Sequence, residues 1–178
     1  MDDVAPRGGA CLDGPVGDYP LTPSQQWTWL QYMQVYHRLE YEMNRQLQTD
    51  SGVSLGDYTV MNAISQAPQG RTQLTALATL IGWERSRLSH HLVRMERRGL
   101  VQRIPSATDR RSTDAALTTA GWNLLREAAP VHARWVREAF FGDLGQDQES
   151  ALGAVLAAVY ENLLRAGTLP RPDYPGHT

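Results

Sequence analysis

Residues 83–99 read WERSRLSHHLVRMERRG, and this stretch decides the fold. Leu88, Leu92 and Met95 fall at positions i, i+4 and i+7, which lie on one face of an α-helix. Basic and hydroxyl side chains project from the other faces: Arg85, Ser86, Ser89, His90 and Arg94. The pattern therefore predicts a helix over residues 84–98 that buries one apolar stripe and exposes a basic surface.

A shorter apolar stripe precedes this helix. Leu77, Ala78 and Ile81 have helical spacing. Thr75 is placed to cap the helix N-terminus, and Gly82 stands where the helix should stop. Two short helices joined by a tight turn that contains glycine, the second of them basic, are typical of a helix-turn-helix.

The segment after the basic helix has the pattern of a β-hairpin. Residues 100–105 (LVQRIP) and 113–117 (TDAAL) predict two strands, and the polar residues 106–112 (SATDRRS) separate them. Two adjacent arginines, Arg110 and Arg111, fall in that loop. We therefore expect a hairpin whose tip carries positive charge.

Positive charge is concentrated in the same region. Residues 83–111 hold eight arginines and three acidic residues, which makes a net charge of +5. The rest of the chain has a net charge of −7, so the whole protein is mildly acidic at −2. A localised cationic surface on an acidic protein is typical of binding to a polyanion such as DNA.

Residues 75–121 resemble the winged helix-turn-helix of the MarR family of bacterial transcriptional regulators. The matching motifs, in order along the chain, are Leu77-Ala78, Ile81-Gly82, Met95-Glu96-x-Arg98-Gly99-Leu100-Val101, Asp109-x-Arg111 and Leu117-Thr118-x-x-Gly121. Each motif is weak alone, but their order and spacing together are specific. The resemblance implies a mainly α fold with a small β-hairpin, in which a winged helix-turn-helix domain is joined to long N- and C-terminal dimerisation helices.

In a protein of this kind the basic helix lies in the DNA major groove and the hairpin tip reaches the minor groove. Arg85 or Arg87 could contact a guanine with paired donors. Asp109 would hold Arg111 in one rotamer for a narrow minor groove, as the resemblance implies. The full set expected to bind DNA is Arg85, Ser86, Arg87, Ser89, His90, Arg94, Arg103, Asp109, Arg110 and Arg111. The alternative is a solvated helix face and a polar loop, since arginine is common on protein surfaces.

Apolar spacing predicts long helices on both sides of this region. One runs over residues 24–48, and two more, separated by a turn at 142–145, cover residues 119–165. Pro130 should bend or break the first of these two. The long helices carry more apolar surface than one small core can absorb, which favours a homodimer.

The domain organisation follows from these elements. We expect a flexible arm over residues 1–22, a single domain over 23–166 with its winged helix-turn-helix core at 55–117, and an irregular tail over 167–178. The arm is rich in glycine, proline and aspartate and shows no apolar periodicity, as disordered segments do.

Aromatic side chains outside the basic helix predict a site for a small effector. The group comprises Trp29, Tyr32, Tyr36, His37, Tyr58 and Trp122. Aromatic walls with polar tips suit a planar aromatic or phenolic ligand. Packing in the core is the alternative explanation of the same side chains.

Composition argues against several other classes of protein. No apolar run approaches the roughly 18 residues of a membrane span, and the N-terminus has no signal pattern, so we expect a cytoplasmic protein. The single cysteine, Cys11, excludes an intrachain disulfide framework and is too few for a cysteine metal site. His90 and His91 point about 100° apart on a helix and chelate poorly, so no metal site is expected. With no nucleophile elbow, phosphate loop or metal cluster, we expect neither an enzyme nor a cofactor.

The sequence thus predicts a homodimeric, sequence-specific DNA-binding regulator, a repressor released from a pseudo-palindromic operator by a small ligand. Two alternatives stay open. One is a redox-responsive regulator that senses oxidants through Cys11, although a flexible arm offers nothing to lower the pKa of the thiol. The other is a winged helix that binds a protein instead of DNA.

Overall fold

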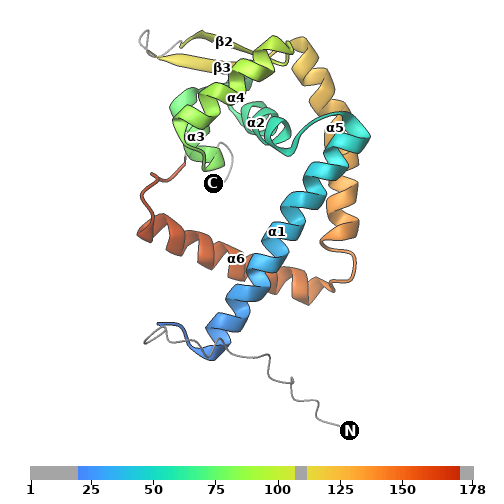
Figure 1. Cartoon of the computed structure of the whole chain (residues 1–178), viewed down its shortest axis with the longest axis vertical. Helices are drawn as coiled ribbons and strands as arrows, with labels where there is room; N and C mark the ends of the chain where they lie inside the picture. Colours follow the sequence, from blue (N-terminus) through green and yellow to red (C-terminus); the bar gives the residue numbers. More distant parts are fainter. Residues whose placement is uncertain (1–19, 107–111, 173–178) are drawn as a thin grey trace. The chain divides into compact units, whose positions relative to one another are not determined.

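The computed structural model describes residues 20–106 and 112–172 (Figure 1). Contacts between Cα atoms divide the chain into two units, residues 1–42 and 43–178, and the boundary falls inside the first helix. Each unit is described by itself. The predicted division into an arm, one domain over 23–166 and a tail stays a prediction.

The first helix, α1 (Pro23–Ser51), is capped by Thr22. The Thr22 hydroxyl accepts a hydrogen bond from the Gln25 amide (3.2 Å), and the Gln25 side chain accepts one from the Thr22 amide (2.8 Å). This reciprocal pair satisfies backbone donors at the helix start. α1 continues beyond the predicted end at residue 48 and stops at Gly52, whose φ of +64° suits a helix terminus.

Two helices in the second unit, α2 (Leu55–Gln66) and α3 (Leu74–Ile81), pack on each other (Figure 1). The Ser54 hydroxyl caps α2 by accepting a hydrogen bond from the Asp57 amide (3.1 Å). Their facing side chains form much of the core, including Val60, Met61, Ile64, Leu77 and Ala78. The next helix packs against this pair.

The basic helix, α4 (Arg85–Arg97), follows α3 after a tight turn at Gly82, which has a φ of +67°. The turn and the predicted apolar stripe are confirmed, because Leu88, Leu92 and Met95 are each 0% exposed. Burial of one such side chain stabilises the fold by about 1.5–3 kcal/mol. This packing fixes which faces of α4 are left at the surface.

The predicted hairpin is present as β2 (Val101–Pro105) and β3 (Thr113–Leu117), which pair antiparallel. At the open end of the pair, the Ser106 amide donates a hydrogen bond to the Ser112 carbonyl (3.1 Å). Residues 107–111, which join the two strands, lie outside the described part of the chain.

A third strand, β1 (Arg71–Gln73), pairs with β3 and makes a sheet of order β1-β3-β2. It escapes sequence analysis because three residues are too few to show an alternating pattern. The strand also corrects the predicted start of α3. Thr75 lies inside that helix and Gln73 occupies the cap position, because the chain passes from β1 directly into α3.

Two helices follow the sheet, α5 (Thr119–Ala139) and α6 (Gln146–Ala166), close to the predicted bounds. The Thr118 hydroxyl caps α5 by accepting a hydrogen bond from the Gly121 amide (3.1 Å). Of the bend or break predicted at Pro130, the break is absent, since α5 continues through this residue.

Gly121 lies where two parts of the backbone approach closely. A Cβ at this position would lie 2.0 Å from the Leu100 carbonyl oxygen, far inside van der Waals contact. Beside it, the Thr118 hydroxyl donates a hydrogen bond to the Gly99 carbonyl (2.5 Å). The start of α5 is therefore held against the segment that joins α4 to β2.

The predicted fold class is confirmed: the protein is mainly helical, with one small antiparallel sheet. In the described segments, no helix has both the length and the apolar character needed to cross a membrane. The same segments contain no group of three or more His, Cys, Asp or Glu side chains placed to hold a metal ion.

Candidate nucleic-acid interface

The surface of α4 carries the polar side chains that the sequence analysis assigned to DNA. Five of them are exposed: Arg85, Ser86, Arg87, His90 and Arg94. Ser89 is partly buried, and Arg97, which the prediction of DNA contacts omitted, is exposed as well. Among the described residues, no carboxylate forms an ion pair with the guanidinium groups of Arg85, Arg87 or Arg94. The helix therefore presents cationic groups that are not neutralised locally.

The start of α4 has no side-chain cap. Glu84 occupies the cap position, and its carboxylate makes no capping hydrogen bond to the first turn. The backbone amides of a first turn have no partner within their own helix. They are consequently left to solvent or to an anion, and the helix dipole favours an anion.

Trp83, in the turn before α4, orients one of the arginines. The guanidinium of Arg87 lies over the Trp83 ring, 4.1 Å from the ring centroid. Such a cation–π contact stabilises by about 0.5–1 kcal/mol at an exposed site. Because the contact uses the face of the guanidinium, the N–H donors of Arg87 stay available to a second partner.

A buried carboxylate in α2 contacts one side chain of α4 and one at its C-terminal cap. The side chain of Asp57 is 6% exposed, with Oδ1 2.8 Å from His91 Nε2 and Oδ2 2.5 Å from Arg98 Nη1. Although His91 Nε2 is close to Oδ1, the angle between the two groups is not that of a regular hydrogen bond. Burial on its own would raise the pKa of Asp57, but the contacts with His91, Arg98 and Ser54 outweigh it and hold that pKa well below its ordinary value. Asp57 is thus an anion that joins α4 to α2.

His91 links this carboxylate to the protein surface. Its Nδ1 lies 2.9 Å from Nη2 of Arg94, one turn further along α4. A guanidinium can only donate, so Nδ1 is the acceptor and the imidazole proton belongs on Nε2, which faces Asp57. Nothing in the sequence indicated Asp57, and His91 was not among the residues expected to contact DNA. The spacing of three residues between His91 and Arg94 was the one available signal.

Arg103, an expected DNA contact, is paired with an acidic residue of α4. Its guanidinium Nη2 lies 2.8 Å from Glu96 Oε2, and its amide donates a hydrogen bond to Glu96 Oε1 (3.0 Å). The pair forms because β2 begins soon after α4 ends and brings the two residues together. The remaining expected contacts, Asp109, Arg110 and Arg111, lie outside the described residues, and their role stays a prediction.

Four of the six predicted effector-site residues form a series of rings along α1. The ring centroids of Trp29 and Tyr32 are 5.5 Å apart, those of Tyr32 and Tyr36 are 6.3 Å apart, and those of Tyr36 and His37 are 5.3 Å apart. The Trp and Tyr rings are about half exposed. The series follows from a spacing of three or four residues between successive Trp and Tyr rings, which places them on one side of a helix.

The other two members of the predicted site, Tyr58 and Trp122, lie in the second unit and pack in different places. Tyr58 meets the edge of the His132 ring, with centroids 4.7 Å apart. Trp122 lies against Gly70, where a Cβ would come within 2.8 Å of the indole. The assignment of all six residues to one effector site stays a prediction.

A buried polar pair connects α5 to the end of α1. His132 Nδ1 lies 2.8 Å from Gln46 Oε1, and the His132 ring stacks on Trp135 with centroids 6.1 Å apart. Burial lowers the pKa of His132. His132 follows Leu125 and Ala128 on the buried stripe of α5, so helical spacing could have identified it as a core residue.

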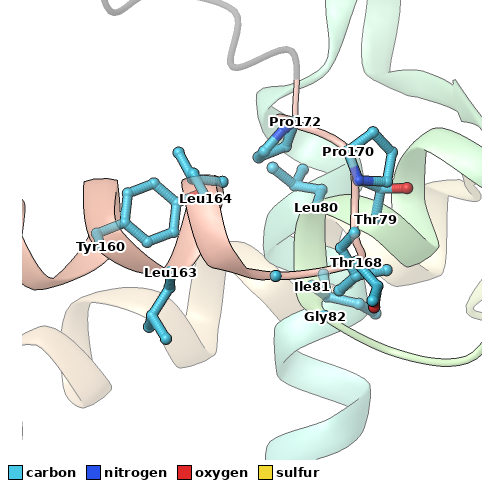
Figure 2. Close-up of a pocket in the computed structure, with 12 residues that line it drawn as sticks. Thr79, Leu80, Ile81, Gly82, Tyr160, Leu163, Leu164, Thr168, Pro170 and Pro172 are labelled. Carbon is cyan, nitrogen blue, oxygen red and sulfur yellow. The ribbon is translucent and has the colours of Figure 1, made fainter.

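A pocket of about 490 Å³ lies between the end of α3 and the end of α6 (Figure 2). Thr79, Leu80 and Ile81 line one side, and Leu163 and Leu164 lie on another. The segment from residue 167 to 172, which follows α6, completes the wall. The lining is mainly apolar and shares no residue with the surface of α4.

These features define the class of protein: a winged helix-turn-helix with an exposed basic second helix. A family model described as the MarR family matches residues 51–112. The chain is 35% identical over 92 residues to the transcriptional regulator HosA of Escherichia coli O157:H7, a match that covers 52% of this chain and 66% of HosA.

Two solved structures extend the likeness over most of the chain. Sco3205, a MarR family transcriptional regulator from Streptomyces coelicolor in complex with DNA, is 36% identical, with 84% of this chain and 94% of that chain covered and a TM-score of 0.78. AbsC, a MarR family transcriptional regulator from the same organism, is 32% identical, with 80% and 96% covered and a TM-score of 0.75. The protein belongs to the MarR family, as the sequence motifs predicted.

Proposed function

We propose that this protein is a homodimeric transcriptional repressor that binds a specific DNA sequence and leaves it when a small aromatic ligand binds. The observation that carries the proposal is the exposed surface of α4, whose arginines 85, 87 and 94 have no carboxylate partner among the described residues. Membership of the MarR family supports it, as does the 36% identity to Sco3205, whose structure contains DNA.

In the proposed complex, α4 enters the major groove with its N-terminal end nearest the base edges. Arg85 and Arg87 are the residues for base contacts, because a guanidinium can bond O6 and N7 of guanine together. Arg94, His90 and the uncapped amides of the first turn bind phosphates, which position the helix without reading the sequence. Arg111 of the wing enters the adjacent minor groove.

The homodimer is proposed from apolar helix faces that lie exposed in each unit. In the first unit, α1 exposes Trp27, Trp29, Leu30, Tyr32, Val35, Tyr36 and Tyr41. In the second unit, α6 exposes Val155, Leu156, Val159, Tyr160 and Leu163. Large contiguous apolar surfaces mark interaction sites. A second copy is the proposed occupant, because a two-fold dimer presents two copies of α4 to half-sites about one helical turn apart.

The proposed effector is a planar aromatic or phenolic molecule that binds the aromatic side chains of the predicted site. It would release DNA only if it binds more tightly to a dimer in which the two copies of α4 are wrongly spaced for the operator. Candidate ligands can be screened by measuring whether each one reduces DNA binding.

The proposal is tested by footprinting the purified protein on the DNA that flanks its own gene, at several salt concentrations. We expect a protected site with approximate two-fold symmetry and an affinity that falls steeply with salt, because phosphate contacts release counterions. Arg85→Ala and Arg87→Ala should weaken protection. Arg137→Ala on α5, where the arginine is 75% exposed, removes the same charge and should leave protection unchanged.

The two alternatives give different results in the same experiment. A winged helix that binds a protein would protect no DNA and show no salt-dependent retention on heparin. A redox-responsive regulator would lose DNA binding on oxidation, and Cys11→Ser would abolish that loss. Cys11 lies outside the described residues, so this alternative has support from the sequence alone.

A further inference from the structure

Four side chains form a stripe along one flank of α4 and its C-terminal cap, Arg98. Arg87, His91, Arg94 and Arg98 follow one another at i, i+4, i+7 and i+11, which is one side of a helix. The three arginines are exposed, whereas the His91 side chain is only 12% exposed. A mostly buried imidazole therefore lies among three cationic groups at the surface.

Each of the three arginines has a different partner. The guanidinium of Arg87 lies on the Trp83 ring, Arg94 donates to Nδ1 of His91, and Arg98 pairs with the Asp57 carboxylate. None of these contacts uses all five N–H donors of a guanidinium. Each arginine is thus restrained and can still bind a further acceptor.

His91 contacts the other two partners, Asp57 and Trp83, and α2 leaves space for the rings. His91 Nε2 lies 2.8 Å from Asp57, and its ring meets the Trp83 ring edge-on with centroids 5.2 Å apart. Gly56 of α2 faces both rings: a Cβ there would lie 3.0 Å from His91 Cε1 and 3.2 Å from Trp83 Cη2. Asp57, Trp83 and His91 are thereby joined into one packed group.

We propose that Asp57, Trp83 and His91 form a positioning cluster that holds Arg87, Arg94 and Arg98 in the orientations in which they bind DNA. This inference rests on the proposed DNA-binding function. A long arginine side chain loses conformational freedom when it binds, and this loss opposes binding. Side chains that are already restrained lose less freedom, so the cluster raises DNA affinity without itself contacting DNA.

The charged groups around His91 determine which tautomer its imidazole adopts. Asp57 of α2 faces Nε2, Arg94 of α4 faces Nδ1, and Arg98 reaches the same carboxylate, while Trp83 and Gly56 are uncharged. The arrangement requires the neutral imidazole with its proton on Nε2. Arg94 depends on the free lone pair of Nδ1, and a side chain without an acceptor at this place leaves Arg94 unrestrained.

A double-mutant cycle on DNA affinity tests the cluster. The probe is a labelled duplex from the region protected in the footprint, and the variants are His91→Leu, Arg94→Ala and the two combined. We expect His91→Leu to weaken binding about tenfold, since a hydrogen bond to a charged group is lost. In the Arg94→Ala background the same substitution should have a much smaller effect, because His91 acts through Arg94.

His91→Gln keeps one donor and one acceptor and should recover part of the affinity lost in His91→Leu. If His91→Leu does not fold, His91→Gln and Arg94→Ala form the cycle, with a smaller expected effect. Arg137→Ala is the control for the loss of one positive charge. An undiminished affinity in His91→Leu, or an equal loss with and without Arg94, would overturn the proposal, because His91 would then be no more than a packing residue.

Failure of the cluster can be distinguished from failure of the proposed function by measuring the free protein. The ¹⁵N chemical shifts of His91 should show a protonated Nε2 and an unprotonated Nδ1 in the wild type. The opposite tautomer would refute the contact with Arg94 whether or not DNA binds. A wild-type protein with the expected tautomer but no DNA binding would instead refute the proposed function and leave the cluster without that role.

Discussion

Asp57 is a single carboxylate that two elements share. It lies in α2 and contacts His91 of α4 and Arg98 at the C-terminal cap of α4, and its side chain is almost fully buried. Its pKa is held well below the ordinary value, so the folded state binds a proton less readily than the unfolded state. The carboxylate therefore stabilises the fold fully above about pH 4, and this contribution is lost as the pH falls below that value.

Asp57→Asn should consequently lower the free energy of unfolding at pH 7 by about 2 kcal/mol. The estimate is kept below that for a fully buried pair because Arg98 is 46% exposed. Between pH 5 and pH 3 the wild type should lose stability relative to the variant, since only the wild type has a carboxylate here that takes up a proton more readily in the unfolded state than in the folded state. Urea unfolding at these three pH values measures both effects. An equal pH dependence in the two proteins would contradict the assignment.

His132 is a base, so its charged form is the protonated one, and it affects stability at a higher pH than Asp57 does. Burial lowers the pKa of His132, so the unfolded state binds a proton more readily than the folded state. Stability should therefore be complete above the ordinary histidine pKa of about 6.5 and fall as the pH drops below it. His132→Gln removes the titrating group, and the stability difference between wild type and variant should change between pH 7.5 and pH 5.5. Thermal melts across that range provide the test.

At the scale of elements, the contact between Gly121 and Leu100 holds α5 against the segment that joins α4 to β2. Gly121→Ala would place a methyl group 2.0 Å from the Leu100 carbonyl oxygen, so the start of α5 has to move. We expect a loss of at least about 2 kcal/mol in the free energy of unfolding.

Gly153→Ala is the matched control, since it makes the same change inside α6, where a Cβ meets nothing within 4 Å. It should be neutral or stabilise the protein by up to about 1 kcal/mol. Chemical denaturation of the two variants measures the difference. Equal stabilities would show that the start of α5 can move freely.

The wing is the second element with a defined expectation. Arg111→Ala should weaken operator binding at least about tenfold while the fold stays intact, because a guanidinium in a narrow minor groove is lost. Anisotropy titration with the protected duplex measures the affinity, and circular dichroism checks the fold. An affinity equal to that of Arg137→Ala would remove the wing from the proposed complex.

At the scale of the whole molecule, the exposed apolar face of α6 should determine the oligomeric state. Val159→Glu places a charge in the middle of that face and should convert the proposed dimer to a monomer, because an unpaired charge is costly to bury. Ala154→Glu adds the same charge on the opposite side of α6 and should leave the dimer intact. Sedimentation velocity measures the mass of each variant. A monomeric wild type would refute the homodimer and, with it, the paired half-sites.

The sequence by itself determined the elements that depend on local spacing. The stripe of Leu88, Leu92 and Met95 and the turn at Gly82 were predicted, because a helix and its end are specified by residues only a few positions apart. The motifs around these residues predicted the MarR family for the same reason. The three-residue strand β1 was missed because its pairing with β3 depends on residues more than forty positions away.

Only the tertiary structure determines which polar side chains on and next to α4 are restrained by a partner, and which residue that partner is. Arg98 pairs with Asp57, which lies 41 residues earlier, and His132 binds Gln46, which lies 86 residues earlier. No local pattern indicates such partners, since they meet only when the apolar stripes of separate helices pack together. The basic character of α4 could therefore be read from its residues, whereas the orientation of its arginines depends on α2 and the turn at Trp83.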